Sequence, residues 1–171
     1  MPSRMKDRIA ETLFDILKEK PFDKITVKEV VEVCDVTRQT FYYHFDDLLD
    51  VLEWSMRKHV KEMGSACLNE EDPIRALRIF IDHTFETRPA MEKLLESQHR
   101  AAIERMMMES IREFLQARVA LDADAASWDD TEVVLDFYTF GIVGTLLSAS
   151  MREGVDPDRL AQQMYQLLYR K

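Results

Sequence analysis

The sequence predicts an all-α protein: a short N-terminal three-helix bundle with a helix-turn-helix, followed by a longer C-terminal helical domain. Apolar residues recur with the helical period along most of the chain. Capping residues precede these periodic segments. The chain has only 4 glycines and 5 prolines among 171 residues, too few for the many turns of an all-β sandwich.

The composition is that of a folded, acidic protein. Hydrophobic residues make up 46% and charged residues 32% of the chain, and 171 residues can bury a core without disulfides. The net charge of −9 gives no general attraction to nucleic acid, so any DNA contact needs a local surface. No glycine-rich phosphate-binding motif is present, and Cys34 and Cys67 form no spaced motif. We therefore expect no cofactor, no bound metal and free thiols.

The sequence also predicts a cytoplasmic protein with no membrane partner. The first eight residues already contain four charged side chains, unlike a secretory signal. The longest uncharged stretch, 137–151, has 15 residues, whereas a membrane-spanning helix needs about 20.

The first expected helix is amphipathic. Ile9, Leu13 and Leu17 fall on one helical face, so this face is predicted to be buried. The helix should end at Lys20, because Pro21 disfavours helical geometry in the residue before it.

Two short helices follow. Thr26 and Glu29 form a capping box for a second helix that ends near Asp35. Thr37 can cap a third helix that continues to about His44. Two helices joined by so few residues have helix-turn-helix geometry.

The rest of the chain predicts longer helices with identifiable ends. In order, these are a helix from Asp46 or Asp47 to about Gly64, one from Asp72-Pro73 to about Thr87, a single long one over 90–119 after Arg88-Pro89, a loop over 120–128, a helix opened by Ser127-x-x-Asp130 that runs to Glu153-Gly154, and a last helix from Asp156-Pro157.

The third helix separates two kinds of side chain. Phe41 and Phe45 are four residues apart, share a face and can fill the core beneath. No acid lies between Val36 and Phe45, although the chain is rich in acids. The outward surface carries polar and aromatic groups from Arg38, Gln39, Tyr42, Tyr43 and His44.

This surface fits the major groove of DNA. Arginine and glutamine side chains can read base edges, and tyrosine hydroxyls can reach phosphates. The N-terminal amides of the second helix, behind Thr26, can hold a phosphate. The alternative is that Tyr42 and Tyr43 cover a neighbouring helix.

The segment resembles the TetR family of transcriptional regulators. The resemblance is carried by T-V-x-E-V at 26–30, by the turn Cys34-Asp35-Val36-Thr37 and by T-F-Y-Y-H-F at 40–45. It implies a DNA-binding domain over residues 1–45 and a helical ligand-binding and dimerisation domain over 46–171. It further implies a homodimer, most often a repressor, on a pseudo-palindromic operator, with a small-molecule effector or a partner protein.

By position, the resemblance divides the DNA contacts into two groups. Phosphate contacts are expected from Thr26, Thr40, Tyr43 and His44. Base or groove contacts are expected from Lys28, Thr37, Arg38, Gln39 and Tyr42.

The chain departs from the family pattern at two places. Asp35 stands where the turn usually has glycine, and aspartate tolerates left-handed geometry. Asp46-Asp47 stands where a lysine usually contacts phosphate. We expect weaker and more salt-sensitive binding, or reliance on the N-terminal cations Arg4, Lys6 and Arg8.

Two further surfaces are expected in the C-terminal part. The apolar helix around 137–147 and the stripe on the last helix can form a monomer core or, as the resemblance favours, a dimer interface. The interface residues are Phe137, Phe140, Gly141, Gly144, Leu147, Leu160, Met164, Leu167 and Leu168. The middle helices offer core filler or a ligand pocket lined by Phe80, His83, Phe85, Met91, His99, Ile103, Met106 and Met107.

Two other functions stay open at this point. Glu96-x-x-His99 and His83-x-x-Glu86 have the spacing of di-metal carboxylate helical bundles, although the second motif is reversed. Asp46-Asp47 prompts an interaction module or co-regulator with weak or no DNA binding. No Ser/His/Asp or Cys/His pairing supports a hydrolase, and no enzymatic activity is expected.

Overall fold

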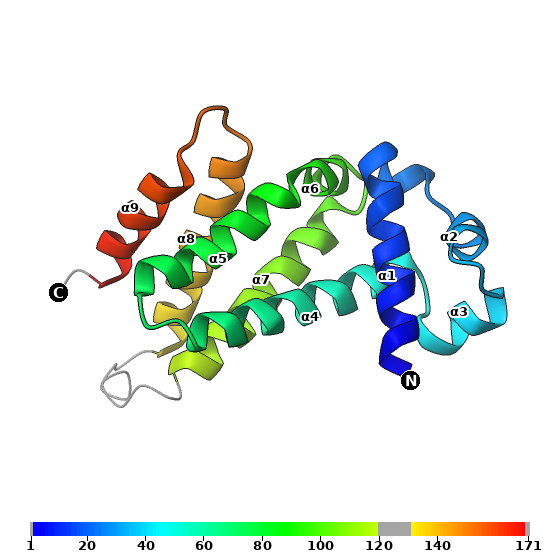
Figure 1. The fold of residues 1–171 in the computed structure, drawn as a ribbon, viewed down its shortest axis with the longest axis horizontal. Helices are drawn as coiled ribbons and strands as arrows, with labels where there is room; N and C mark the ends of the chain where they lie inside the picture. The colour runs from blue at the N-terminus through cyan, green and yellow to red at the C-terminus, as the bar shows by residue number, and fades with distance from the viewer. Residues whose placement is uncertain (1, 120–130, 170–171) are drawn as a thin grey trace. The chain divides into compact units, whose positions relative to one another are not determined.

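The computed structural model describes residues 2–119 and 131–169, and in these residues all regular structure is helical. This confirms the all-α prediction. The elements are α1 Pro2–Glu19, the 3-10 helix η1 Phe22–Lys24, α2 Val27–Val33, α3 Arg38–His44, α4 Leu48–Leu68, α5 Pro73–Glu86, α6 Arg88–Leu95, α7 Arg100–Val119, α8 Thr131–Ser150 and α9 Pro157–Tyr169 (Figure 1). The loop expected over 120–128 and the cap at Ser127–Asp130 lie outside the described residues.

The chain forms two compact units. One contains the residues up to Lys58 together with Pro89–Met106, and the other contains His59–Arg88 and the residues from Met107 onward. Helices α4 and α7 therefore each contribute to both units.

The first unit is built on the predicted amphipathic face of α1. Ile9, Leu13 and Leu17 are fully buried, and α1 ends at Glu19, just before the proline. The Thr26 hydroxyl accepts a hydrogen bond from the Glu29 amide at 3.2 Å, as a cap should. The Glu29 carboxylate, however, pairs with the Lys20 ammonium at 2.6 Å, which supports the turn before α2.

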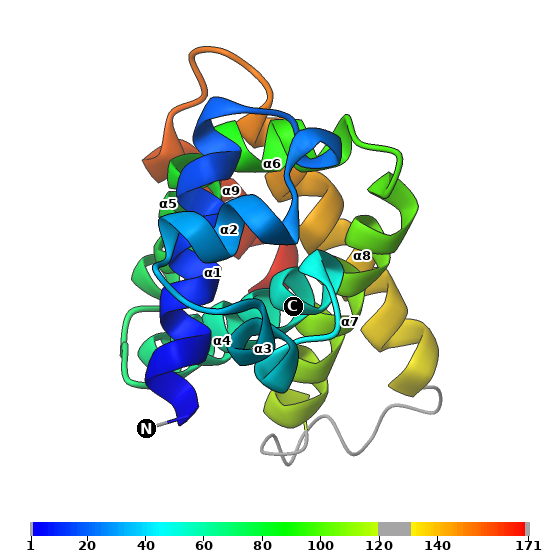
Figure 2. The ribbon, with the colours of Figure 1, turned by 90° about the vertical axis from the view of Figure 1, so that its right-hand side faces the viewer.

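The turn between α2 and α3 has the predicted geometry. Asp35 adopts φ of 51°, the left-handed conformation that glycine takes without strain. Thr37 caps α3 by accepting a hydrogen bond from the Thr40 amide at 3.0 Å. The α1–α3 bundle can be followed in Figure 2.

The prediction of one helix over 90–119 is wrong, because α6 and α7 are separate helices. The Ser97 hydroxyl donates to the Leu94 carbonyl at 2.7 Å and accepts from the His99 amide at 3.2 Å. These bonds replace the helical ones at the turn, as serine side chains often do. The Gln98 amide is satisfied by the carboxylate of Asp23 at 3.1 Å.

The prediction that the fourth helix ends near Gly64 is also wrong, since α4 continues to Leu68. A Cβ at Gly64 would lie 2.7 Å from the ring of Phe114 on α7, so glycine is present here to admit the ring. The next helix begins as predicted, with the Asp72 carboxylate accepting from the Ile74 amide at 2.9 Å.

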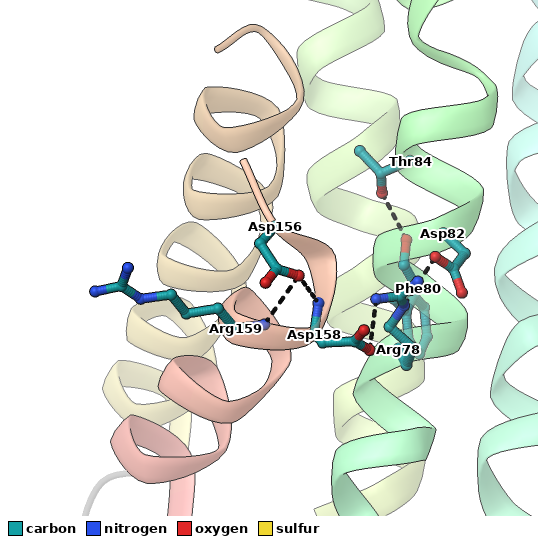
Figure 3. A network of polar contacts seen from close by, with 7 residues as sticks. All are labelled: Arg78, Phe80, Asp82, Thr84, Asp156, Asp158 and Arg159. Carbon is teal, nitrogen blue, oxygen red and sulfur yellow. Dashed lines mark hydrogen bonds and ion pairs between the residues drawn. The ribbon is translucent and has the colours of Figure 1, made fainter. Parts of the chain in front are cut away.

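The core of the second unit lies among α5, α8 and α9, which run side by side (Figure 1). Its buried residues are Ile81, Leu146, Ala149, Leu160, Ala161 and Met164. A polar clamp supports it at one edge: Arg78 on α5 binds Asp82 at 2.9 Å and Asp158 on α9 at 2.8 Å (Figure 3). Asp156 caps α9 by accepting from the Asp158 amide at 2.9 Å.

Helix α8 ends at Ser150, three residues before the predicted end, and Gly154 in the following turn has φ of 71°. By length and composition α8 could cross a membrane, but a third of that span is buried inside the structure. A single helix of this kind is weak evidence for a membrane segment, because core helices of water-soluble proteins also meet these criteria.

Candidate nucleic-acid interface

Helix α3 is oriented by its two phenylalanines. Phe41 and Phe45 are 0% and 2% exposed, and their ring centroids lie 6.1 Å apart. Because they anchor one face of the helix in the core, the opposite face must point outward. The helix is short, and the Thr37 cap and the buried rings fix its position.

The outward face carries the predicted tyrosines. Tyr42 and Tyr43 are 57% and 82% exposed. The ring of Tyr42 meets Phe41 edge-on at 5.4 Å, and the ring of Tyr43 meets His44 edge-on at 5.0 Å. The chain thus exposes two aromatic side chains on one short helix, and each ring packs against the ring of its neighbour in sequence.

None of the nine predicted DNA contacts is buried. Thr40 and His44 are partly exposed, and the exposed members are Thr26, Lys28, Thr37, Arg38, Gln39, Tyr42 and Tyr43. Within the described part of the chain, no carboxylate pairs with Arg38, so its guanidinium is available to a partner. Lys28 lies 3.8 Å from Glu32, and both side chains are exposed.

Thr37 has a structural role that the resemblance did not imply. Its hydroxyl accepts from the Thr40 amide at 3.0 Å and lies 2.8 Å from the Thr40 hydroxyl. A hydroxyl that is already bonded on two sides has little capacity left to select a base. The other predicted base or groove contacts, Lys28, Arg38, Gln39 and Tyr42, have exposed side chains and stay predictions.

The N-terminal cations are mostly engaged within the first unit. The Lys6 ammonium lies 4.8 Å from the ring centroid of Phe45 and 5.8 Å from that of Trp54, in cation–π geometry. The Arg8 guanidinium donates to the carbonyl of Cys34 in the helix-turn-helix. Of the three cations considered for phosphate contacts, Arg4 and Arg8 are exposed and Lys6 is partly exposed.

The acids that replace the usual lysine cap α4. Asp47 accepts from the Asp50 amide at 2.9 Å, and Asp50 accepts from the Asp46 amide at 3.0 Å. The Asp47 carboxylate thus occupies an N-terminal amide of α4 that could otherwise bind an anion such as phosphate. The sequence indicated a cap here but not this reciprocal pair.

A protein-family model decides the family of this part of the chain. Residues 9–52 match the model described as "Bacterial regulatory proteins, tetR family". The amino-terminal domain belongs to the TetR family. The match runs from the middle of α1 to the first turn of α4, includes the whole helix-turn-helix, and confirms the resemblance seen in the sequence.

Solved structures share the fold over nearly the whole chain. The dihydroxyacetone kinase operon activator DhaS has a TM-score of 0.69 and 18% identity, covering 95% of this chain and 93% of that one. A TetR-family regulator from Syntrophomonas wolfei has a TM-score of 0.67 and 15% identity, covering 98% and 94%. AibR, solved with isovaleryl coenzyme A and operator DNA, has a TM-score of 0.52 and 16% identity, covering 96% and 98%.

No curated protein matches the chain in sequence. Because the structural relatives are less than 25% identical to this chain, they establish its fold and leave its operator and effector open. The TetR-family match and these structures support a DNA-binding transcriptional regulator.

The predicted dimer residues fall into three groups by exposure. Leu160 and Met164 are buried in the core of the second unit, so they do not belong to an exposed surface. Leu147 and Leu168 are partly exposed. The remaining five are exposed: Phe137, Phe140, Gly141, Gly144 and Leu167.

The eight predicted pocket residues are divided between the two units. Met91, Ile103 and Met106 are buried in the first unit, where His99 meets the ring of Phe22. The other four belong to the second unit: Phe80, His83, Phe85 and Met107. A pocket that unites all eight residues stays a prediction.

The di-metal alternative finds no support in the described residues. Its two motifs, around His83 and His99, lie in different units. No group of three or more His, Cys, Asp or Glu side chains is placed to hold a metal in the part of the chain that the structure describes. Burial raises the pKa of the Cys67 thiol to about 11, so the thiol stays protonated at neutral pH and is a poor nucleophile.

Proposed function

We propose that this chain is a transcriptional repressor that binds a pseudo-palindromic operator as a homodimer, with α3 in the major groove. The observation that carries the proposal is the outward face of α3, which exposes Tyr42 and Tyr43 while Phe41 and Phe45 are buried. Two large exposed aromatics without an acidic neighbour on the helix are costly in water and useful against DNA.

The chemistry of that face suggests how the operator is read. Arg38 can bind the N7 and O6 atoms of guanine in bidentate fashion, and Gln39 can bind the N6 and N7 positions of adenine. The ring of Tyr42 can lie against a thymine methyl group. Hydroxyl and imidazole groups of Thr26, Thr40, Tyr43 and His44 suit phosphate oxygens.

The homodimer is supported by an apolar surface on α8. Phe137 and Phe140 are 73% and 62% exposed. A Cβ at Gly141 or Gly144 would meet no atom within 4 Å, so nothing inside the chain requires a glycine there. Glycines between exposed phenylalanines allow a second copy to approach closely, and a two-fold interface buries the same patch on both chains.

The proposed domains follow from this arrangement. Residues 1–45 read DNA, and residues 46–171 dimerise and bind a small-molecule effector or a partner protein. AibR, which shares the fold, was solved with an acyl coenzyme A and operator DNA, and this supports an effector of the regulatory domain. An effector that changes the distance between the two DNA-binding domains of the dimer would prevent both from binding half-sites about 34 Å apart.

Selection of bound duplexes from a random pool at fixed salt tests the proposal. The expected result is an enriched inverted repeat for the wild type and loss of enrichment for the double variant Arg38→Ala/Tyr42→Ala. Arg75→Ala removes an exposed arginine of α5 and serves as the matched control. Selection of no duplex, or an unchanged motif with the double variant, would overturn the proposal.

The direction of regulation is tested separately. Transcription in vitro from a promoter that carries the selected site should fall when the protein is added. An increase would instead place the chain with activators, like the operon activator that shares its fold.

A second function is favoured by one observation: carboxylates cap the start of α4, while Lys6 and Arg8 of the DNA-binding domain contact other groups of the same domain. A helical interaction module with weak or no DNA binding would show this pattern. Failure to bind any selected duplex at low salt would support it.

A further inference from the structure

Two of the four histidines of the chain stack face to face between α4 and α5. The ring centroids of His59 and His83 are 5.2 Å apart, and the ring planes are inclined by 25°. Both side chains are partly buried in the second unit. The stack is a direct contact between two helices, made by side chains whose charge changes near neutral pH.

Charged residues of the second unit lie on α4, α5 and α7, and one of them acts on the stack. On α5, Glu86 lies one turn after His83 and its charge favours the protonated ring. Asp82 on the same helix pairs with Arg78 at 2.9 Å. The other charged residues that α4 and α7 contribute to this unit are Lys61, Glu62, Glu109, Arg112, Glu113 and Arg118. Glu86 is the carboxylate whose charge acts on His83.

Two effects oppose protonation of His83 and one favours it. Burial and then the neighbouring His59 lower the pKa of His83 from its usual 6.5, whereas Glu86 raises it. Burial removes the charged ring from water, and a second imidazolium 5.2 Å away would repel the first. The stacked geometry therefore suits the neutral pair.

We propose that the His59–His83 stack is an acid-sensitive contact, which holds α4 against α5 while both rings are neutral and releases α4 when the pair becomes protonated. Helix α4 begins at Leu48 in the first unit, directly after the recognition helix, and carries His59 where it enters the second unit. Its effect on operator binding rests on the proposed function. The contact itself does not.

The direction of the pH effect follows from linkage. The pKa of His83 is lower in the folded than in the unfolded chain, so the unfolded chain binds more protons between those two values. The free energy of unfolding must therefore fall as the pH drops through 6.5, and this loss levels off below the folded pKa.

Proton NMR of the full chain tests the contact without DNA, because four imidazoles give separable titration curves. His83 should titrate below 6.5 in the wild type. His59→Gln should raise that pKa and Glu86→Gln should lower it further. His99→Gln alters a histidine of the other unit and should leave it unchanged. A His83 that titrates at its ordinary pKa, or that ignores His59→Gln, would overturn the proposal.

Urea unfolding at about pH 7.5 and about pH 5.5 gives the second readout. The wild type and His99→Gln should lose folding stability on acidification, by up to roughly a factor of ten in the equilibrium constant, because about pH 5.5 lies one unit below the ordinary histidine pKa. His83→Gln should lose less. If His83→Gln does not fold, His59→Gln takes its place in this comparison. Equal losses in all variants would contradict the proposal.

Operator affinity at the same two pH values gives the regulatory readout. The wild type should bind a selected duplex more weakly in acid, and His83→Gln should retain more of its affinity. His44→Gln separates the titration of the DNA-facing histidine. Equal affinity of the wild type at both pH values would overturn the regulatory role. If no duplex binds at any pH, the proposed function fails while NMR and urea unfolding still decide the contact.

Discussion

The Gln98 amide donates a hydrogen bond of 3.1 Å to the carboxylate of Asp23, which lies 75 residues earlier in the chain. The bond joins η1 to the turn between α6 and α7, both within the first unit. Beside it, the ring of Phe22 meets His99 edge-on at 5.8 Å. The turn after α1 and the start of α7 are thus fixed to one another.

Asp23→Ala should lower the free energy of unfolding by about 1 kcal/mol, because the variant removes the carboxylate that accepts from the Gln98 amide and water replaces it only in part. Asp23→Asn keeps an acceptor oxygen and should restore part of the loss. Asp15→Ala breaks an exposed pair with Lys18 and should cost less than about 0.5 kcal/mol. Urea unfolding measures all three, and equal losses for Asp23→Ala and Asp15→Ala would contradict this role.

Gly64→Ala tests the close approach of α4 and α7. Alanine usually stabilises a helix relative to glycine by about 1 kcal/mol, but here its methyl group would lie 2.7 Å from the ring of Phe114. That ring also packs against Phe80 at 5.4 Å and has little room to retreat. We expect a net loss of about 1 kcal/mol in thermal or urea unfolding.

A smaller side chain at position 114 removes the clash with the added methyl group and gives the control for Gly64→Ala. In a Phe114→Leu background the side chain is smaller, so Gly64→Ala should become neutral or stabilising. A stabilising Gly64→Ala in the wild-type background would show that the ring moves aside.

The helix-turn-helix could be predicted from the sequence because its determinants are local. Thr26 and Thr37 cap the two helices of this motif through amides three positions away. The cap of α5 by Asp72, outside the motif, is equally local. Asp35 takes the left-handed geometry that the turn requires. The buried and exposed faces of α3 follow from helical periodicity alone.

The features that were missed depend on partners distant in sequence. The break between α6 and α7 is fixed partly by Asp23, and Lys6 is held by Phe45 and Trp54. Periodicity left the stripe with Leu160 as a monomer core or a dimer interface, and the resemblance favoured the interface, whereas Leu160 packs in the core of the second unit. Hydrophobicity predicts that a side chain is buried, but not whether its own chain or a second copy covers it.

A charge on the exposed face of α8 should prevent dimerisation without unfolding the single chain. Phe140→Glu adds a carboxylate to a side chain that is 62% exposed, so the single chain should stay folded while a two-fold interface buries two like charges. Light scattering should show a dimer for the wild type and a monomer for the variant, with unchanged helical circular dichroism. Val33→Glu, at an exposed apolar residue of α2, is the control and should remain a dimer. A dimeric Phe140→Glu would place the interface elsewhere.

Asp46→Lys should strengthen DNA binding by restoring the basic residue that the family usually has before α4. The Asp46 main-chain amide keeps its bond to Asp50, and the cap from Asp47 is untouched, so stability should change little. A new lysine–phosphate contact should steepen the dependence of log K on log salt by about 0.9 per half-site. Asp47→Lys adds the same charge but removes the cap, and should cost about 1 kcal/mol of stability. Fluorescence anisotropy over a salt series measures both variants, and an unchanged salt slope for Asp46→Lys would mean that the start of α4 lies away from the phosphates.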